Sequence, residues 1–251
     1  FVLRYFMDLS YDGTNYHGWQ NQPNAISVQS CIEKALSLLI KAETQIFGAG
    51  RTDTGVHAMK MCAHFDSNLL LDLSKLIYDL NSFLPKDISI NDIYKVNEES
   101  HARFDAISRV YDYKISLNKD VFNINRSYFI NNVMDINLMN QACVILKSHT
   151  NFKCFSKSKT DVKTYNCEIF DALWIFKNGK LVFTIKANRF LRNMVRAIVG
   201  TMIQVGLKKI SLDYFQEILI SQDRTKAGPS APAHALYLSN IEYPKEIRSN
   251  E

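Results

Sequence analysis

The sequence predicts an α+β fold in which two similar lobes share a largely antiparallel, mixed sheet flanked by helices. Three observations lead to this prediction. Segments with strand-like and helix-like periodicity alternate along the chain, hairpin signals outnumber clear βαβ units, and no repeat of 20–50 residues indicates a solenoid. With 251 residues, of which 47% are apolar, the chain can bury a substantial core.

The first half of the chain reads as strands interleaved with two helices. Residues 2–10 alternate like a half-buried strand and end at the turn signal Asp12-Gly13. Ser27 is a suitable N-cap for an amphipathic helix over 28–42. The remaining elements predicted here are strands over 45–47, 59–66 and 88–96, a glycine-rich loop at 48–55, and a helix over 73–83 that stops before Pro85.

The second half repeats this style. Asn178-Gly179 separates two apolar segments and is the pair that a type I′ hairpin favours, because both positions need a positive φ. A strand over 107–117 places Tyr111 and Tyr113 on one face with Ile115 and Leu117. The other predicted elements are strands over 166–177, 180–187 and 235–243, and helices over 136–148, 189–205 and 211–221.

Charge is distributed unevenly and suggests a boundary between the lobes. Residues 1–100 carry 8 Lys and Arg against 12 Asp and Glu, a balance of −4, whereas residues 101–251 carry 22 against 13, a balance of +9. No flexible linker marks the change. We therefore predict an N-terminal lobe over 1–104 and a basic C-terminal lobe over 105–251.

The stretch from Lys153 to Arg196 holds ten basic and three acidic residues. Such a block attracts polyanions by neutralising phosphates and releasing counterions. A solvated, lysine-rich surface accounts for the same composition equally well. Charge alone therefore suggests a nucleic-acid partner without establishing one.

Cysteine usage and hydropathy limit the class of protein. The five cysteines are an odd number without a close CxxC pair, so we expect small buried residues in a reducing compartment. No run approaches the roughly 18 apolar residues of a membrane span, and the first residues do not resemble a signal peptide. The expectation is a cytoplasmic protein without a membrane partner.

The densest unusual segment is Gly48-Ala49-Gly50-Arg51-Thr52-Asp53-Thr54-Gly55-Val56-His57-Ala58, which follows a predicted strand. Glycines let a backbone adopt positive φ and approach a ligand closely. Arg51 lies two residues from Asp53, where a guanidinium would keep the carboxylate ionised and fix its rotamer. Asp53 is therefore a candidate nucleophile or base, although an Asp that only caps a turn is the commoner case.

Other known motifs do not fit this loop. A Walker A loop needs GxxxxGK[ST], and a dinucleotide fingerprint needs glycine where Asp53 stands, so no nucleotide cofactor is expected. His57, Cys62 and His64 are the nearby residues that could bind a metal ion, and a metal-dependent hydrolase would use His57 and His64. Their spacing across a turn, without HExxH or a second cluster, makes a metal site a weak alternative.

Several segments together resemble the tRNA pseudouridine synthase A family. The glycine-rich loop resembles the family's GRTDAGVHA signature, and Tyr11–Gln20 its YDG…GWQ opening. Further matches are Ser100–Phe104 (an FHARF-type element), Arg109–Tyr113 (RxYxY), Lys186–Gly200 (KAxxFLxxMVRxIVG) and Ala227–Leu238 (A…APAxGLYL). They occur in the family's order and cover nearly the whole chain. Two departures are Thr54, whose hydroxyl could donate to Asp53 and lower its pKa, and His234-Ala235.

The resemblance implies a pseudouridine synthase fold and a cofactor-free isomerase that converts uridine to pseudouridine in the anticodon stem-loop of tRNA, at positions 38–40. Asp53 matches the family's essential aspartate. Whether that carboxylate attacks the base, attacks C1′ or removes a sugar proton stays open. The alternative is a tRNA-binding chaperone without catalysis, and the intact Asp53, Arg51 and Tyr111 argue against it.

The resemblance also implies that the C-terminal lobe completes the active-site cleft and that residues in both lobes have roles there. Arg51 and Arg196 would stabilise the carboxylate, and Tyr111 would stack on the flipped base, opposite a pocket wall at Leu236. Backbone contacts with tRNA, which offset the cost of unstacking the target, fall to His101, Arg103, Lys153, Lys157, Lys159 and Lys163. Recognition would follow tRNA shape, and family members work as homodimers.

Overall fold

The computed structural model describes residues 2–158 and 162–248. The chain forms two compact units. The first contains Phe1–Ile107 and Tyr237–Glu251, and the second contains Ser108–Leu236. The lobes predicted from charge divide after residue 104 and leave residues 237–251 in the second lobe. In the structure these last residues belong with the first unit, because their strand pairs with a strand there.

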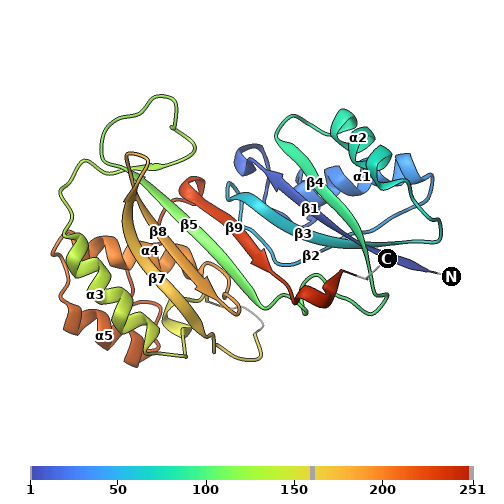
Figure 1. Cartoon of the computed structure of the whole chain (residues 1–251). Coiled ribbons are helices and arrows are strands. Elements are labelled where there is room, and N and C mark those ends of the chain that lie inside the picture. The colour runs from blue at the N-terminus through green and yellow to red at the C-terminus, as the bar shows by residue number, and fades with distance from the viewer. Residues whose placement is uncertain (1, 159–161, 249–251) are drawn as a thin grey trace. The chain divides into compact units, whose positions relative to one another are not determined.

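The sheet of the first unit is centred on two long antiparallel strands (Figure 1). β1 (Leu3–Tyr11) pairs antiparallel with β3 (His57–Ser67) and with β4 (Ile88–Val96). The short β2 (Phe47–Gly48) pairs antiparallel with β3. β9 (Leu236–Glu242) pairs in parallel with β3, where His57 lies opposite Tyr237.

Two capped helices pack on this sheet. α1 (Val28–Ile40) begins where the Ser27 side chain accepts a hydrogen bond from the Ser30 N–H, and the Ser30 hydroxyl returns one to the backbone of Ser27. α2 (Leu73–Phe83) begins at the Asp72 side chain. α1 contacts α2, and α2 contacts β4. The predicted N-cap at Ser27 and the predicted end of the second helix before Pro85 are confirmed.

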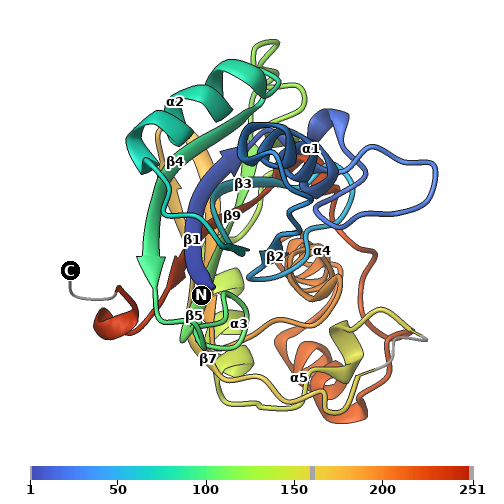
Figure 2. The same cartoon turned by 90° about the vertical axis from the view of Figure 1, so that its right-hand side faces the viewer.

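The second unit joins three antiparallel strands to three helices. β8 (Lys180–Ala187) lies between β5 (Ser108–Ser116) and β7 (Ile169–Lys177), and the short β6 (Tyr128–Phe129) runs parallel to β5. Asn178 and Gly179 have φ of 52° and 73°, so the predicted hairpin turn is confirmed. α3 (Ile136–Lys147), α4 (Met194–Gly206) and α5 (Leu212–Ser221) lie on one side of these strands (Figure 2).

The core of the second unit lies between its strands and helices. Trp174 of β7 stacks on Phe183 of β8 with ring centroids 4.9 Å apart, and its indole N–H lies 3.3 Å from the sulfur of Met202 in α4. The Asn140 side chain of α3 bonds both backbone groups of Trp174. Both units therefore combine mostly antiparallel strands with helices, which confirms the α+β prediction. Four of the five cysteines are buried and Cys31 is partly exposed.

One predicted boundary is wrong. The helix expected over 189–205 begins at Met194, because Asn193 adopts a left-handed conformation with φ of 66° just before it. Residues 188–193 form a loop whose ends are fixed by the Asn188 side chain, which accepts from the Glu168 N–H, and by the Arg192 carbonyl, which accepts from the Lys157 N–H. Short 3₁₀ turns were not predicted: Gly13–Asn15, Lys153–Phe155, Ala233–Ala235 and Lys245–Ile247.

Candidate active site

Asp53 is held at the first position of a tight turn. The Val56 N–H donates to the Asp53 carbonyl at 3.1 Å, and Gly55 at the third position has φ of +81°. That conformation is the one a type II turn requires of its third residue, and glycine adopts it without strain. The turn joins the glycine-rich loop to β3, and Asp53 is partly exposed. The backbone of Asp53 is therefore fixed, while its side-chain carboxylate stays accessible to a ligand.

The segment Tyr11–Trp19 packs directly on this loop. The Tyr11 hydroxyl lies 2.7 Å from the buried Thr52 hydroxyl, and the Trp19 N–H donates to the Thr52 carbonyl at 3.2 Å. Gly18 has φ of +83°, and a Cβ there would lie 2.4 Å from the Thr52 carbonyl oxygen. The residue next to Asp53 is thus held by both its side chain and its carbonyl.

A second set of contacts fixes the loop where it enters β3. The Gly13 N–H donates to Nδ1 of the buried His57 at 3.0 Å, and a Cβ on Gly13 would lie 2.0 Å from the Val56 carbonyl oxygen. An imidazole nitrogen that accepts an N–H carries no proton, so the 3.1 Å approach of an Asp12 oxygen to the same Nδ1 is not a hydrogen bond. His57 is a structural acceptor, and its ring lies tilted against the Tyr237 ring at a centroid distance of 4.7 Å.

The start of the loop is equally constrained. Gly48 pairs across from Ala63, and the Ala49 N–H donates to the Cys62 carbonyl at 2.8 Å. A Cβ at Gly48 would lie 2.4 Å from Nε1 of Trp19. Sequence reasoning missed these supporting roles of Tyr11, Gly13, Gly18 and Trp19. The signal was present in the YDG and GWQ segments, but their contact with the loop depends on tertiary packing.

The neighbours of Asp53 differ from two expectations. Arg51 is exposed, and within the described residues it forms no ion pair with Asp53. Thr54 is exposed as well and, in this described loop, donates no hydrogen bond to Asp53. Arg51 is two residues from Asp53 and Thr54 is one residue from it, but neighbouring side chains of an extended loop point in different directions. Closeness in sequence therefore did not produce contact. The guanidinium of Arg51 faces solvent.

His101 and Arg103 lie in a loop over 100–105 in the first unit. The Ala102 N–H donates to Nδ1 of His64, and the Arg103 N–H donates to Nδ1 of His101, both at 3.1 Å. Burial lowers the pKa of His64 to about 4, and the neighbouring His101 and Arg4 shift it in the same direction, while Asp66 and Asp105 oppose the shift. Burial also lowers the pKa of His101. We therefore treat both rings as neutral acceptors. Arg103 itself is exposed.

Tyr111 and Arg196 lie in the second unit. Tyr111 on β5 is opposite Ile185 of β8, and its ring meets the Phe190 ring edge-on at a centroid distance of 5.1 Å. Arg196 on α4 donates from Nε to the Ala231 carbonyl at 2.8 Å, and the Ala231 N–H donates to the Arg196 carbonyl at 2.9 Å. Arg196 thus fixes the chain segment that leads to Leu236, which is buried.

The predicted RNA-contact lysines are surface residues where they can be described. Lys153, Lys157 and Lys163 are exposed, and Lys159 lies outside the described residues. Lys153 Nζ lies 5.7 Å from the Tyr165 ring centroid. The predicted site residues thus divide between the units. Asp53, Arg51, His101 and Arg103 belong to the first, and the others to the second. Their joint action stays a prediction.

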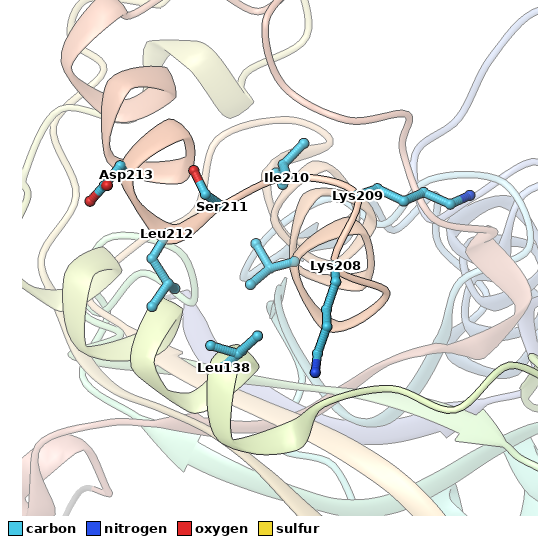
Figure 3. A pocket seen from close by; sticks show the side chains of 8 residues that line it. Leu138, Lys208, Lys209, Ile210, Ser211, Leu212 and Asp213 are labelled. Atoms are coloured by element: carbon cyan, nitrogen blue, oxygen red, sulfur yellow. The ribbon is translucent and has the colours of Figure 1, made fainter.

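A cavity of about 510 Å³ lies within the second unit, between α3 and the turn from α4 to α5 (Figure 3). Its lining includes Leu138, Val205 and residues 208–213. Lys208 at its rim is paired with Asp135 at 3.3 Å. The cavity contains none of the predicted site residues, so we assign it no role.

Neither a metal-binding cluster nor a membrane-spanning helix occurs in the described part of the chain. No group of three or more His, Cys, Asp or Glu residues gathers there in a way that could hold a metal ion. No described helix combines the length and the apolar character needed to cross a bilayer. The site is instead a fixed loop that presents one carboxylate, within an α+β protein rich in exposed basic residues.

Comparison with known sequences shows the family to which the chain belongs. A family model described as tRNA pseudouridine synthase matches residues 9–105 and 142–244. The chain belongs to this family. It is 51% identical to a tRNA pseudouridine synthase A from Bacteroides fragilis over 98% of both chains. It is 49% identical to one from Bacteroides thetaiotaomicron, over 100% of this chain and 94% of the relative, and 41% identical to one from Syntrophomonas wolfei, over 96% and 97%.

We predict that Gly18→Ala destabilises the protein far more than Gly179→Ala does. Both glycines have positive φ, but a Cβ at Gly179 meets nothing within 4 Å, whereas one at Gly18 strikes the Thr52 carbonyl. The control should cost about 1–2 kcal/mol of unfolding free energy from backbone strain. Gly18→Ala should cost about 1–3 kcal/mol more from overpacking. Urea denaturation of both variants measures the difference, and equal losses would contradict the close loop contact.

Stability should also fall as the pH drops from 6.5 toward 4. The folded pKa of His64 is about 4 against an ordinary value of 6.5, so the unfolded chain binds more protons between those values. The free energy of unfolding should decrease by up to about 1.4 kcal/mol per pH unit for that proton. Denaturant titrations across this range measure the slope. His64→Asn keeps an acceptor oxygen for the Ala102 N–H but removes the titrating group. The slope of the unfolding free energy against pH should therefore decrease by the contribution of one proton, and an unchanged slope would refute the assignment.

Proposed function

We propose that this protein isomerises uridine to pseudouridine in the anticodon stem-loop of tRNA, with Asp53 as the reacting carboxylate. The observation that carries the proposal is the loop itself, in a member of the tRNA pseudouridine synthase family. Its turn fixes the Asp53 backbone, and the neighbouring Thr52 is held by Tyr11 and Trp19, which are distant in sequence. Such preorganisation is what a reacting group needs in order to act without reorganising.

The reaction requires no cofactor in this proposal. Uridine and pseudouridine are isomers, so breaking the bond from N1 to C1′ and forming one from C5 to C1′ adds no atom and transfers no net electrons. The chain's own groups must hold the uracil while it turns, must remove one proton from C5 and must let N1, which has lost its bond to C1′, gain one. We assign the proton transfers and the stacking of the base to Tyr111, whose hydroxyl and ring can do both.

The cations have separate roles in the proposal. Arg196 stabilises negative charge during the reaction, and its backbone-bonded side chain gives it a defined place on α4. Arg51, which is exposed near Asp53 in the sequence, supplies a further positive charge to the reacting site when RNA is bound. Leu236 forms an apolar wall against the base. His101, Arg103 and the lysines of the second unit contact the tRNA backbone, which offsets the cost of extracting a nucleotide from its stack.

We further propose that two copies act together as a homodimer in the cytoplasm, where tRNA is modified. Supporting the dimer, β7 leaves large apolar side chains exposed on the second unit: Leu173, Ile175 and Phe176 are 43%, 41% and 61% exposed. Apolar groups gathered along one strand are typical of a surface that a partner covers. The oligomeric state in solution, measured by light scattering, tests this part independently of catalysis.

Asp53→Ala should abolish pseudouridine formation, with a loss of about 10³-fold or more, while tRNA affinity stays within about threefold of the unsubstituted protein. Purified protein is incubated with unmodified tRNA in the absence of added cofactor, and pseudouridine is mapped in the product. Asp72→Ala, which removes a helix cap distant in sequence, is the control for a lost carboxylate. Normal product from Asp53→Ala would overturn the catalytic assignment. Tight binding without product from the unsubstituted protein would favour the chaperone alternative.

Binding of tRNA should weaken steeply with salt, and the basic block should account for part of the slope. Replacing Lys153, Lys157 and Lys163 together with Gln should reduce the slope of log K against log salt by about 2–3, since each phosphate contact contributes about 0.9. The matched control replaces Lys34, Lys41 and Lys86, which are equally exposed but lie in the first unit. Equal slopes in the two triple variants would contradict the role of the basic block.

A further inference from the structure

Four aromatic rings of the first unit contact one another in space, each touching the next. We call them the aromatic row: Phe47, His64, His101 and Phe104. Phe47 stacks on His64 with centroids 5.2 Å apart and planes 21° apart. His64 meets His101 at 4.5 Å, and His101 meets Phe104 at 4.3 Å. The ends of the row are open to solvent, since Phe47 is 51% and Phe104 73% exposed, whereas His64 is buried.

The row is rigid because backbone contacts hold each histidine. Phe47 and His64 are cross-strand partners on β2 and β3. The Nδ1 atoms of His64 and His101 accept the N–H groups of Ala102 and Arg103, and the Asp105 carboxylate accepts the His101 N–H at 2.7 Å. Phe104 is therefore presented on a fixed loop. An aromatic group that is already ordered loses little conformational entropy when a ligand covers it.

The chemistry of the row suits an unpaired nucleotide. Both histidines accept at Nδ1 and are neutral, so the row itself offers flat π faces without charge. A positive charge lies beside it, because the Arg103 guanidinium is 5.7 Å from the Phe104 ring centroid. Proteins that hold single-stranded nucleic acid combine a cation for the phosphate with an aromatic face for the base. Both are present here on one loop.

The row and the loop that carries Asp53 are joined through β3, where His64 lies seven residues beyond His57, about 23 Å along the strand. Phe47 directly precedes Gly48, which opens the loop carrying Asp53. Other exposed aromatic side chains of this unit are not arranged in this way. In the described first unit, Tyr78 and Phe83 on α2 are 73% and 53% exposed but contact no other aromatic ring. The clustering therefore distinguishes Phe47 and Phe104 from ordinary exposed aromatic residues.

We propose that the aromatic row binds unpaired nucleotides that lie a few nucleotides from the target uridine, with a base stacked on Phe104 and its phosphate near Arg103. The inference rests on the proposed function and extends it, since it assigns RNA contact to Phe47 and Phe104. An anticodon stem-loop supplies unpaired bases a few nucleotides from a stem uridine. The row thus holds the loop side of the substrate while Asp53 acts on the target.

A fluorescent reporter at position 104 tests the contact directly. The chain's two tryptophans, Trp19 and Trp174, are 3% and 1% exposed, so Phe104→Trp adds the exposed indole that dominates the change in signal. Adding an anticodon stem-loop RNA should quench its emission or shift it to shorter wavelength as a base stacks on it. Tyr78→Trp, at an equally exposed site, should not respond. A fully paired RNA of the same length should leave both variants unchanged.

Kinetics supply the second measurement. Phe104→Ala should raise KM for the stem-loop about 5- to 100-fold and leave kcat within about threefold, since one stacked base contributes that much binding. Phe104→Tyr should restore KM, and Tyr78→Ala should match the unsubstituted protein.

If the enzyme converts the RNA but the fluorescence of Phe104→Trp does not change when that RNA is added, the inference is overturned and the proposed function stays intact. A reporter that responds to protein concentration instead of RNA would assign the row to a protein contact and overturn it as well. If no pseudouridine forms at all, the proposed function fails, while the titration still decides whether RNA covers Phe104.

Discussion

The contact between Gly18 and the Thr52 carbonyl is the constraint on which the candidate active site depends. A side chain at position 18 would occupy the space of that carbonyl, and the positive φ of Gly18 aims the next N–H, from Trp19, at the same oxygen. The Tyr11 hydroxyl then holds the Thr52 side chain. With Thr52 fixed on two sides, the turn that follows places Asp53. The acid is oriented by backbone packing, so its position does not rely on a salt bridge with Arg51.

The elements of the fold were predictable because their signals are local. Ser27, Pro85 and Asn178-Gly179 each act within a few residues, through capping, the lack of a donor and positive φ. The start of α4 was predicted wrongly for a related reason. Apolar periodicity runs through Phe190 and Leu191, but the chain there is held as a loop by Glu168 and Lys157, which are distant in sequence. Local patterns do not contain those contacts.

The site was predictable in its chemistry and less so in its construction. Resemblance of the glycine-rich loop singled out Asp53, and residue spacing suggested Arg51 as its cation. The expected ion pair with Arg51 does not form in the structure, because two side chains of an extended loop need not face one another. The support from Tyr11, Gly13 and Gly18 was hidden, since nothing in a sequence states which distant loop a glycine touches. The aromatic row was hidden in the same way: His64 reads as one residue of a strand until the loop over 100–105 packs on it.

Charged residues and aromatic stacking would contribute to RNA binding in different ways. Contacts between lysines and phosphates act over a distance and do not depend on sequence, so the basic block of the second unit can gather tRNA without placing any particular uridine. Placement needs contacts that act only at short range. The aromatic row lies in the same unit as Asp53 and is held by the same β3 strand that continues from the loop. A base stacked on Phe104 would therefore be registered against the carboxylate by rigid backbone, whereas a phosphate held by a flexible lysine would not. Selection of a uridine near an unpaired loop then follows from stacking geometry, without any hydrogen bond that reads the neighbouring sequence.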